Sequence, residues 1–503
     1  MPLQGPLNWT ILLPEIALVG GAILLLLMDI AVPRQRGPHL AVVTFAAVVA
    51  AGALAFDQWD APPLGGLGNM VVQDNFGVFA RWVILGAAAL ATLTAPGYLA
   101  PRGLDKAEFY SLLLLSTTGM TLLAVSADLV MVFLAVELLS LCLYIMAGFE
   151  RTRLEAQEAS MKYFLLGAFA SAFLLYGIAF VFGGSGTTSL IRLHASASTG
   201  GLDDLRLIGV AVAFLVVGLG FKAAMVPFHM WAPDVYEGAP TPVTAYMAAG
   251  VKAAAFAAFL RVWIEAFGHL YDAWHPALWW LAALTMVVGN LVALQQRNLK
   301  RMLAYSSIGH TGFLLVAVTA ATSQATGAFL FYLLAYTLAT MGAFAVIIGL
   351  GTASAPRERV EDYHGLWQER PGIAIAMAVF MLAMLGFPVF GGMGFFAKWY
   401  VLQAAIDAPA PQVRLAVVLV LATTISAGYY LYVVMVMFMK PRPEGAPALP
   451  PISSMSRAVI VTSAVLLIVF GLFPDPVVRW SRAGTALSTG MPPDAAIPRT
   501  AGR

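Results

Sequence analysis

Long apolar segments follow one another along almost the whole 503-residue chain, and they limit the possible folds more than any other feature. Hydrophobic residues make up 60% of the sequence and charged residues 11%, against roughly 25% charged residues in a soluble domain. A helix of about 20 apolar residues crosses a bilayer while satisfying its own backbone hydrogen bonds. The sequence therefore predicts an all-α integral membrane protein.

We expect about 14 transmembrane helices in this chain. The segment 9–30 lacks a basic stretch before it and a small-residue cleavage site, so we expect it to be the first span and not a signal peptide. The expected spans are 10–30, 39–56, 75–95, 108–125, 127–149, 160–182, 205–228, 241–262, 277–295, 301–320, 325–350, 372–406 in two pieces, 412–438 and 457–473.

Two of these spans contain residues that interrupt helices. Pro227 lies at the end of the seventh span, and the stretch 385–399 in the twelfth contains Pro388 and several glycines. Backbone groups freed by such a break survive only where protein or a water-filled cavity meets them. We therefore expect broken helices at both places.

The two breaks also suggest an internal repeat, since the letters LGF precede both, at 219–221 and at 385–387. A pair of interrupted spans at matching places in two halves is typical of transporters. We expect two five-helix repeats, spans 4–8 and 9–13, and because five is odd the second repeat should be inverted. The expected division is 1–107 as an N-terminal three-helix segment, 108–262 and 277–438 as the repeats, and 439–503 as the last helix and tail.

Basic residues are concentrated in the loops that follow odd-numbered spans. These loops carry Arg34, Arg36, Arg102, Lys106, Arg151, Arg153, Lys162, Arg297, Lys300, Arg301, Arg357, Arg359, Arg370, Lys440, Arg442 and Arg457. The even-numbered loops carry Arg192, Arg206, Arg261 and Arg414, and the C-terminal tail adds Arg479, Arg482, Arg499 and Arg503. Cytoplasmic loops are enriched in Lys and Arg. The odd-numbered loops should therefore be cytoplasmic, and both termini should lie on the opposite face.

Four ionisable residues lie within the apolar segments: Glu137, Lys222, Lys252 and Lys398. A charge at mid-membrane costs about 3 kcal/mol on insertion scales, so such residues usually mark a path for protons or ions. Lysine suits proton transfer because burial favours its neutral form, a nearby carboxylate favours its charged form, and arginine does not readily deprotonate. The alternatives are lysines that reach the interface and a glutamate that only joins two helices. Arg81 is interpreted as an interfacial or paired charge.

Several other classes of function lack their motifs. The single cysteine, Cys142, excludes a disulfide framework and any cysteine-based iron–sulfur or zinc site. We find no dinucleotide fingerprint, phosphate-binding loop, Cys/His metal cluster or nucleophile elbow. The net charge of +2 does not indicate nucleic-acid binding. We therefore expect no cofactor, no metal and no redox chemistry in this chain.

Three parts of the sequence resemble a known family: HMWAPDVYEGAPTPVTAY at 229–246, YSSIGHTGF at 305–313, and Glu137 in the fifth span. They are similar to the antiporter-like subunits of proton-pumping NADH:quinone oxidoreductase, respiratory complex I. The resemblance covers nearly the whole chain, and the stretch 233–246 together with Lys398 is most similar to the subunit N type. The related subunits of multisubunit sodium/proton antiporters are the alternative, and a structural membrane spacer that conducts no protons is a third interpretation.

The resemblance implies a role for each matched residue. Glu137 and Lys222 would form a carboxylate–lysine pair, Lys252 would continue the axis, and Lys398 would be the terminal lysine of the second half-channel. Further polar positions of the family fall on Lys162, His229 and His310. Their alternatives are an ordinary cytoplasmic charge for Lys162, a cap on freed carbonyls for His229, and a packed polar residue for His310.

The resemblance also implies an assembly. NAD, FMN, iron–sulfur clusters and quinone would be bound by partner subunits. The expected neighbours are the sister subunit M on one side and small subunits such as K on the other, with lipids around them and no nucleic acid. The location would be a bacterial inner membrane, with both termini in the periplasm.

Overall fold

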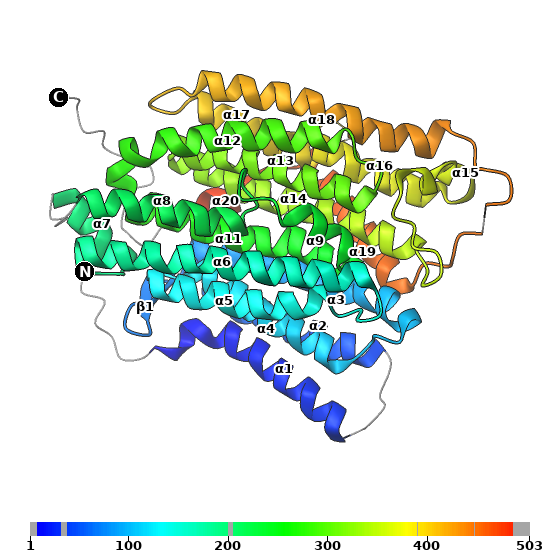
Figure 1. Cartoon of the computed structure of the whole chain (residues 1–503), viewed down its shortest axis with the longest axis horizontal. Helices are drawn as coiled ribbons and strands as arrows, with labels where there is room; N and C mark the ends of the chain where they lie inside the picture. The colour runs from blue at the N-terminus through cyan, green and yellow to red at the C-terminus, as the bar shows by residue number, and fades with distance from the viewer. Residues whose placement is uncertain (1–7, 32–37, 200–204, 390, 447, 486–503) are drawn as a thin grey trace.

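The computed structural model describes residues 8–31, 38–199, 205–389, 391–446 and 448–485. Its helices lie side by side with their long axes mostly along one direction (Figure 1). Within these ranges twelve helices are long and apolar enough to cross a membrane, which confirms an all-α membrane protein. Arg34, Arg36, Arg499 and Arg503 fall outside the described residues.

The long helices match the predicted spans closely. Eleven of the twelve are α1 (Leu13–Ala31), α2 (Pro38–Phe56), α3 (Asn75–Leu99), α4 (Ala107–Val125), α5 (Leu129–Ala147), α6 (Leu154–Ser185), α12 (Tyr271–Ala293), α13 (Leu299–Ala320), α14 (Ser323–Leu350), α18 (Val413–Met439) and α19 (Ser454–Leu472). The seventh span is the shorter α8 (Leu205–Lys222). The eighth span is one continuous helix made of α10 (Thr241–Tyr246), a π-helical segment Met247–Val251, α11 (Lys252–Leu260) and a second π-helical segment Arg261–Ala266.

Both predicted interruptions are present. The seventh span ends as α8 at Lys222, and the chain forms helix again only at α9 (Ala232–Gly238). The twelfth span is split into α16 (Pro371–Leu385) and α17 (Met393–Ile406). Glycine is required at this second break because a Cβ on Gly394 would overlap the carbonyl oxygen of Ala383. Since α8, α16 and α17 are not among the twelve span-length helices, the number fourteen stays a prediction.

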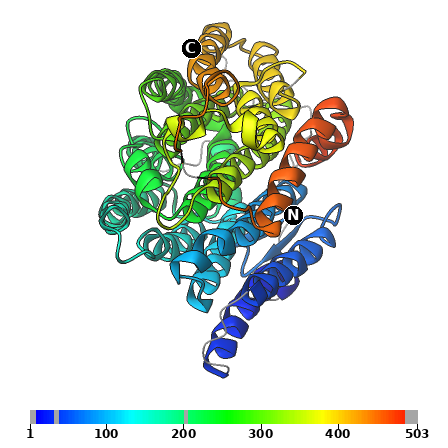
Figure 2. The same cartoon turned by 90° about the vertical axis from the view of Figure 1, so that its right-hand side faces the viewer.

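Several short elements were not predicted. Strands β1 (Leu64–Gly66) and β2 (Val71–Gln73) form an antiparallel pair after α2. The short helices are α7 (Leu190–Thr199), α15 (Leu366–Glu369) and α20 (Asp475–Ala483), with 3-10 turns at Trp9–Leu12, Ala100–Arg102, Gly268–Leu270 and Val360–Tyr363. The α20 helix lies against α14, α3 and α19 at the edge of the bundle (Figure 2). Most of these elements lie in loops, where apolar periodicity gives no signal.

The packing of the helices is consistent with a repeat. In the first unit α4 packs on α5 and α11, and α6 packs on α5 and α8. In the second unit α12 packs on α13 and α18, and α14 packs on α13, α16 and α17. The same neighbour relations therefore recur five spans later. The inversion of the second unit and the division at residues 107, 262, 277 and 438 remain predictions.

Two arginines, Arg81 and Arg261, are buried inside the bundle, and the position of Arg261 differs from the predicted one. Arg81 is fully buried, and it is paired as expected, but with Glu15 on α1 at 2.9 Å. Arg261 was expected in an even-numbered loop, whereas it is fully buried in the helix that continues to Ala266. Its guanidinium lies 2.6 Å from the carboxylate of Asp74 and 3.1 Å from that of Glu265. The pairing with two carboxylates offsets the cost of this burial, and Glu265, four residues later in the same helix, is a local signal of it in the sequence.

Candidate functional site

Lys222 ends helix α8 at the first break, and its side chain is buried. Its ammonium nitrogen lies 5.1 Å from the ring centre of Tyr163, 5.5 Å from that of Tyr144 and 5.8 Å from that of Phe221. This nitrogen makes no hydrogen bond to any part of the chain that the structure describes. Aromatic faces stabilise a cation more weakly than a carboxylate partner does. Lys222 is therefore buried among aromatic rings with no strong partner within the described residues.

Glu137, the expected partner of Lys222, lies on α5 and is half-buried. Its carboxylate accepts a hydrogen bond from the hydroxyl of Ser171 on α6. Within the described residues no ion pair within 4.0 Å joins Glu137 to Lys222. The ion pair implied by the resemblance is therefore not formed in this structure, although both residues lie on helices of the same packed group, α5, α6 and α8.

Lys252 lies at the start of α11, immediately after a π-helical segment. Such segments are frequent at functional sites. The Lys252 ammonium donates to the carbonyl oxygen of Ser307 at 2.5 Å and to the hydroxyl of Thr311 at 2.6 Å. The Thr311 hydroxyl in turn donates to the carbonyl of Ala223 at 2.6 Å, and Ala223 is the residue after Lys222. One side chain on α13 therefore connects Lys252 to the first break.

His310 lies on α13, one residue before Thr311, and both of its ring nitrogens are engaged. Nδ1 lies 2.6 Å from the hydroxyl of Tyr332, and Nε2 lies 3.0 Å from the hydroxyl of Tyr430. Tyr430 also hydrogen-bonds Ser306. Because a tyrosine hydroxyl both donates and accepts, each neutral form of the histidine ring finds a suitable partner. His310 thus connects α13 to α14 and α18 in a buried polar cluster.

Lys398 lies on α17, past the second break. Its ammonium donates to the carbonyl oxygen of Leu385, the last residue of α16, at 2.9 Å, and lies 4.5 Å from the ring centre of Phe313. A small cavity of about 10 Å³ is lined by Lys398, His310 and Tyr336 among others. That volume is near the lower limit for one water molecule. The break therefore supplies the carbonyl oxygen that accepts a hydrogen bond from Lys398. His310 and Lys398 border the same small cavity.

The other two predicted polar residues lie apart from this chain of lysines. His229 is buried in the stretch between α8 and α9, and its Nδ1 atom has no hydrogen-bond partner within the described residues. Lys162 lies on α6 with 41% of its side chain exposed, paired with Glu158 at 2.5 Å and Asp234 at 2.7 Å. Their roles in a pathway remain predictions.

An ion-pair network surrounds Lys162. Asp234 also lies 2.8 Å from Arg301, which reaches Glu237 at 2.7 Å. Burial alone would raise the pKa of Asp234, but hydrogen bonds from Lys162 and Arg301 bring it below its usual value, so Asp234 stays ionised at neutral pH. This network joins α6, α9 and the start of α13 at one end of the bundle.

Sequence reasoning missed several members of the site. Tyr332, Tyr430 and Thr311 bridge the lysines and His310, and nothing in their sequence context separates them from ordinary packing residues. Lys300 was assigned to a loop, yet it is fully buried and reaches the carboxylate of Glu358 at 3.2 Å. A signal for Lys300 existed, because Asn298 caps α13 and so places Lys300 in its first turn.

No group of three or more His, Cys, Asp or Glu side chains in the described ranges is arranged to hold a metal ion. The site described above consists of a carboxylate, lysines, a histidine and hydroxyl groups. These side chains come from eight helices, α5, α6, α8, α11, α13, α14, α17 and α18.

Comparison with known proteins identifies the family. Residues 126–426 match the family described as NADH:quinone oxidoreductase/Mrp antiporter, transmembrane. The NADH-quinone oxidoreductase subunit N of Gemmatimonas aurantiaca is 48% identical over 499 residues, which cover 97% of this chain and 95% of that protein. The chain belongs to the subunit N family. A chain in the structure of respiratory complex I from Thermus thermophilus is 36% identical to this member of the subunit N family, with a TM-score of 0.79, and the match covers 93% of this chain and 99% of that one.

The subunit N fold extends to more distant proteins. A chain of the Mrp complex from Dietzia sp. is 22% identical with a TM-score of 0.81, over 95% of this chain and 96% of that one. This second likeness concerns the fold alone. The fold of the bundle is therefore shared by proteins that differ strongly in sequence.

Proposed function

We propose that this chain is a membrane-arm subunit of NADH:quinone oxidoreductase that translocates protons through Glu137, Lys222, Lys252 and Lys398, driven by redox chemistry in other subunits. Membership of the subunit N family supports the assembly and the activity. NAD, FMN, iron–sulfur clusters and quinone would be held by partner subunits. Subunits M and K are the proposed neighbours, in a bacterial inner membrane with both termini periplasmic.

One observation carries the proposal. Lys222, Lys252 and Lys398 are all buried, and none of them has a carboxylate within 4.0 Å in the described part of the chain. Burial without a counter-charge destabilises the charged form of a lysine, so a small change in its surroundings shifts its protonation. By contrast, a buried charge kept for stability is normally paired.

The contacts suggest an order of events. When Glu137 pairs with Lys222 the carboxylate favours the charged lysine, and when Glu137 instead accepts from Ser171 the lysine loses that support. We propose that the released proton reaches Lys252, which the Thr311 hydroxyl joins to the carbonyl of Ala223 at the first break. The ring centre of Tyr336 lies 5.6 Å from the Lys252 nitrogen. Tyr336, His310 and Lys398 line the same small cavity, which would complete the path. His229 and Lys162 are proposed as secondary polar positions beside this path.

The test is to replace Lys222 and Lys398 by alanine in the complete complex. We expect NADH:quinone turnover and proton uptake into inverted vesicles to fall while the complex still assembles. Lys440→Ala is the matched control, because Lys440 is exposed beyond the end of α18. Pumping at the wild-type level in both variants would refute the proposal.

Two further variants separate the competing functions. If the chain were only a membrane spacer, Glu137→Gln and Lys252→Ala would leave pumping unchanged. If it served a sodium/proton antiporter, deletion of the chain would cause salt sensitivity with normal NADH oxidation. Sodium-dependent proton exchange in vesicles would then be the decisive assay.

A further inference from the structure

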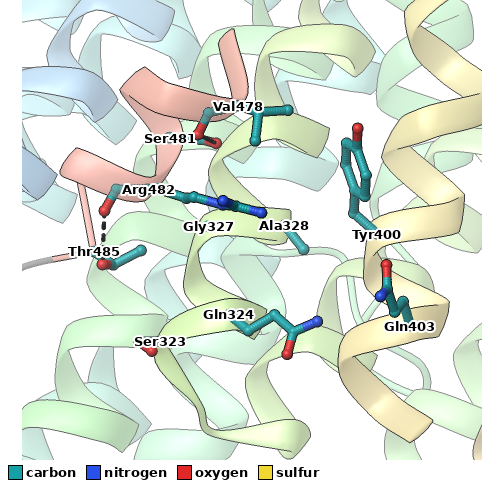
Figure 3. A pocket seen from close by; sticks show the side chains of 10 residues that line it. All are labelled: Ser323, Gln324, Gly327, Ala328, Tyr400, Gln403, Val478, Ser481, Arg482 and Thr485. Carbon is teal, nitrogen blue, oxygen red and sulfur yellow. Dashed lines mark hydrogen bonds between the residues drawn. The ribbon is translucent and has the colours of Figure 1, made fainter. Parts of the chain in front are cut away.

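A hollow of about 430 Å³ opens between the start of α14, the middle of α17 and α20, and none of the buried lysines lines it (Figure 3). Its volume falls within the range of about 300–1,000 Å³ that is usual for small-molecule sites. Most of the residues that line it are polar, although they come from helices that are otherwise apolar. A polar hollow of this size at the edge of a membrane bundle is a candidate ligand-binding site.

Arg482, Gln324 and Gln403 border the hollow from three different helices. Figure 3 shows the guanidinium of Arg482 extending from α20 toward the space between Gln324 on α14 and Gln403 on α17. Arg482 is the one charged residue that lines the hollow, and its side chain has neither an ion pair nor a hydrogen bond within the described residues. Two carboxylates act on the wall of the hollow: that of Asp407 accepts from Gln324 at 3.4 Å, and that of Asp475 on α20 interacts electrostatically with Tyr400.

This set of groups matches an oxyanion. A guanidinium offers two parallel N–H donors to a phosphate, and amide N–H groups complete the contact. The position of α20 points to the source of that anion. The buried residues of the helix are Val477 and Ser481, whereas Arg479 lies on the opposite face and is exposed, and Trp480 is exposed beside the buried face. Short helices with basic and aromatic residues on their outer face lie in the headgroup layer of a membrane.

We propose that the hollow binds a phosphate group and that its ligand is the phosphodiester headgroup of a membrane phospholipid, with Arg482, Gln324 and Gln403 as its contacts. Inorganic phosphate shares this chemistry, so the test must distinguish the two. The site is independent of the proton pathway, and it would attach α20 to α14 and α17 through the lipid.

The test uses a cysteine reporter in the complete, delipidated complex in maltoside detergent. Cys142 is the only cysteine of the chain and is buried, so Ser323→Cys on the wall of the hollow introduces the one exposed thiol. The rate of maleimide labelling of this chain is measured alone and with phosphatidylglycerol, diacylglycerol or inorganic phosphate. Thr485→Cys, also on the wall, replaces the reporter if the first variant does not assemble.

We expect phosphatidylglycerol at about four times its Kd to slow labelling about fivefold, because the open fraction falls to about one-fifth. Diacylglycerol should have no effect, since it lacks the phosphate. Protection by inorganic phosphate to the same extent would identify the free anion as the ligand. Protection by diacylglycerol as well, or by none of the three, would overturn the proposal.

Matched arginine variants on α20 show which group is responsible. Arg482→Gln should abolish protection by phosphatidylglycerol, whereas Arg479→Gln should keep it, because Arg479 lies on the same helix but does not line the hollow. NADH:quinone activity of the variants checks that the complex is intact. Equal loss of protection in both variants would reduce the effect to general surface charge and refute the assigned site.

Discussion

Buried charges occur in two very different settings in this molecule. Beside α3, Arg261 reaches Asp74 and Glu265 and also donates to the carbonyl of Ala124 at 2.8 Å. Along the broken helices, Lys222, Lys252 and Lys398 have aromatic rings, hydroxyls and backbone carbonyls around them but no carboxylate within 4.0 Å in the described residues. Arg261 is therefore paired with opposite charges, whereas within the described residues the three lysines are not.

The difference separates structure from function. Breaking a buried cluster in which each charge is paired costs much stability, and the pairing opposes any change in the protonation of its members. An under-satisfied buried lysine is poised between its two protonation states, which is what a proton path requires. The arginine cluster joins α3 to the 241–266 helix, whereas Lys222 and Lys398 lie near the two breaks and Lys252 follows a π-helical segment.

Loss of Arg261 should have the largest effect. Arg261→Ala takes the guanidinium away from the buried carboxylates of Asp74 and Glu265, and removing one partner of a buried ion pair costs about 3–5 kcal/mol. We expect little of the variant chain in the membrane and a lower Tm of any complex that forms, measured by immunoblot and thermal unfolding. Arg414→Ala is the control, since Arg414 is exposed. Normal assembly of Arg261→Ala would mean that the cluster is not structural.

A permanent charge at Lys222 should separate activity from assembly. Lys222→Arg keeps a cation over the rings of Tyr144 and Tyr163 but does not readily release a proton. We expect normal assembly and a turnover reduced about tenfold, or about 1.4 kcal/mol in the barrier. The measurements are NADH:quinone activity and vesicle acidification, with Lys440→Arg as the control. Full activity of Lys222→Arg would show that Lys222 need not lose its proton.

The bridge at Thr311 should have a moderate effect. Thr311→Val removes the hydroxyl between Lys252 and the Ala223 carbonyl while it keeps the shape of the side chain. We expect turnover to fall about fivefold, since a net hydrogen bond is worth about 1 kcal/mol. Thr92→Val serves as the comparison, because the Thr92 hydroxyl bonds only the carbonyl of Ala88 in its own helix. An equal effect of both variants would contradict a relay through Thr311.

The smallest change is expected at Lys162. Its partners are partly exposed, and such ion pairs are worth about 0–1 kcal/mol. Asp234 also keeps Arg301 as a partner when Lys162 is removed. Lys162→Ala should therefore retain turnover within about twofold of the wild type in the same assay. A loss as large as that of the Lys222 variants would place Lys162 in the pathway.

The sequence by itself determined the class and the chemistry of the site. Apolar length predicts spans because a bilayer accepts only backbones that satisfy their own hydrogen bonds, and the Pro and Gly residues near 227 and 388 predicted both breaks. Asp128 directly precedes a long apolar run, as a helix cap does, and it caps α5 by accepting from the backbone N–H of Val130. The buried lysines could be recognised in the sequence because each lies within a long run of apolar residues.

Tertiary structure alone decided the partners of these charges. The bond of Glu137 to Ser171, the bridge through Thr311 and the tyrosines around His310 join residues from different helices. The same holds for Arg261, whose partner Asp74 is 187 positions away in the chain. Apolar periodicity tells which segments enter the membrane, but it does not fix how each helix is rotated against its neighbours. That rotation is set by close packing across the whole bundle, and it decides which polar atoms meet.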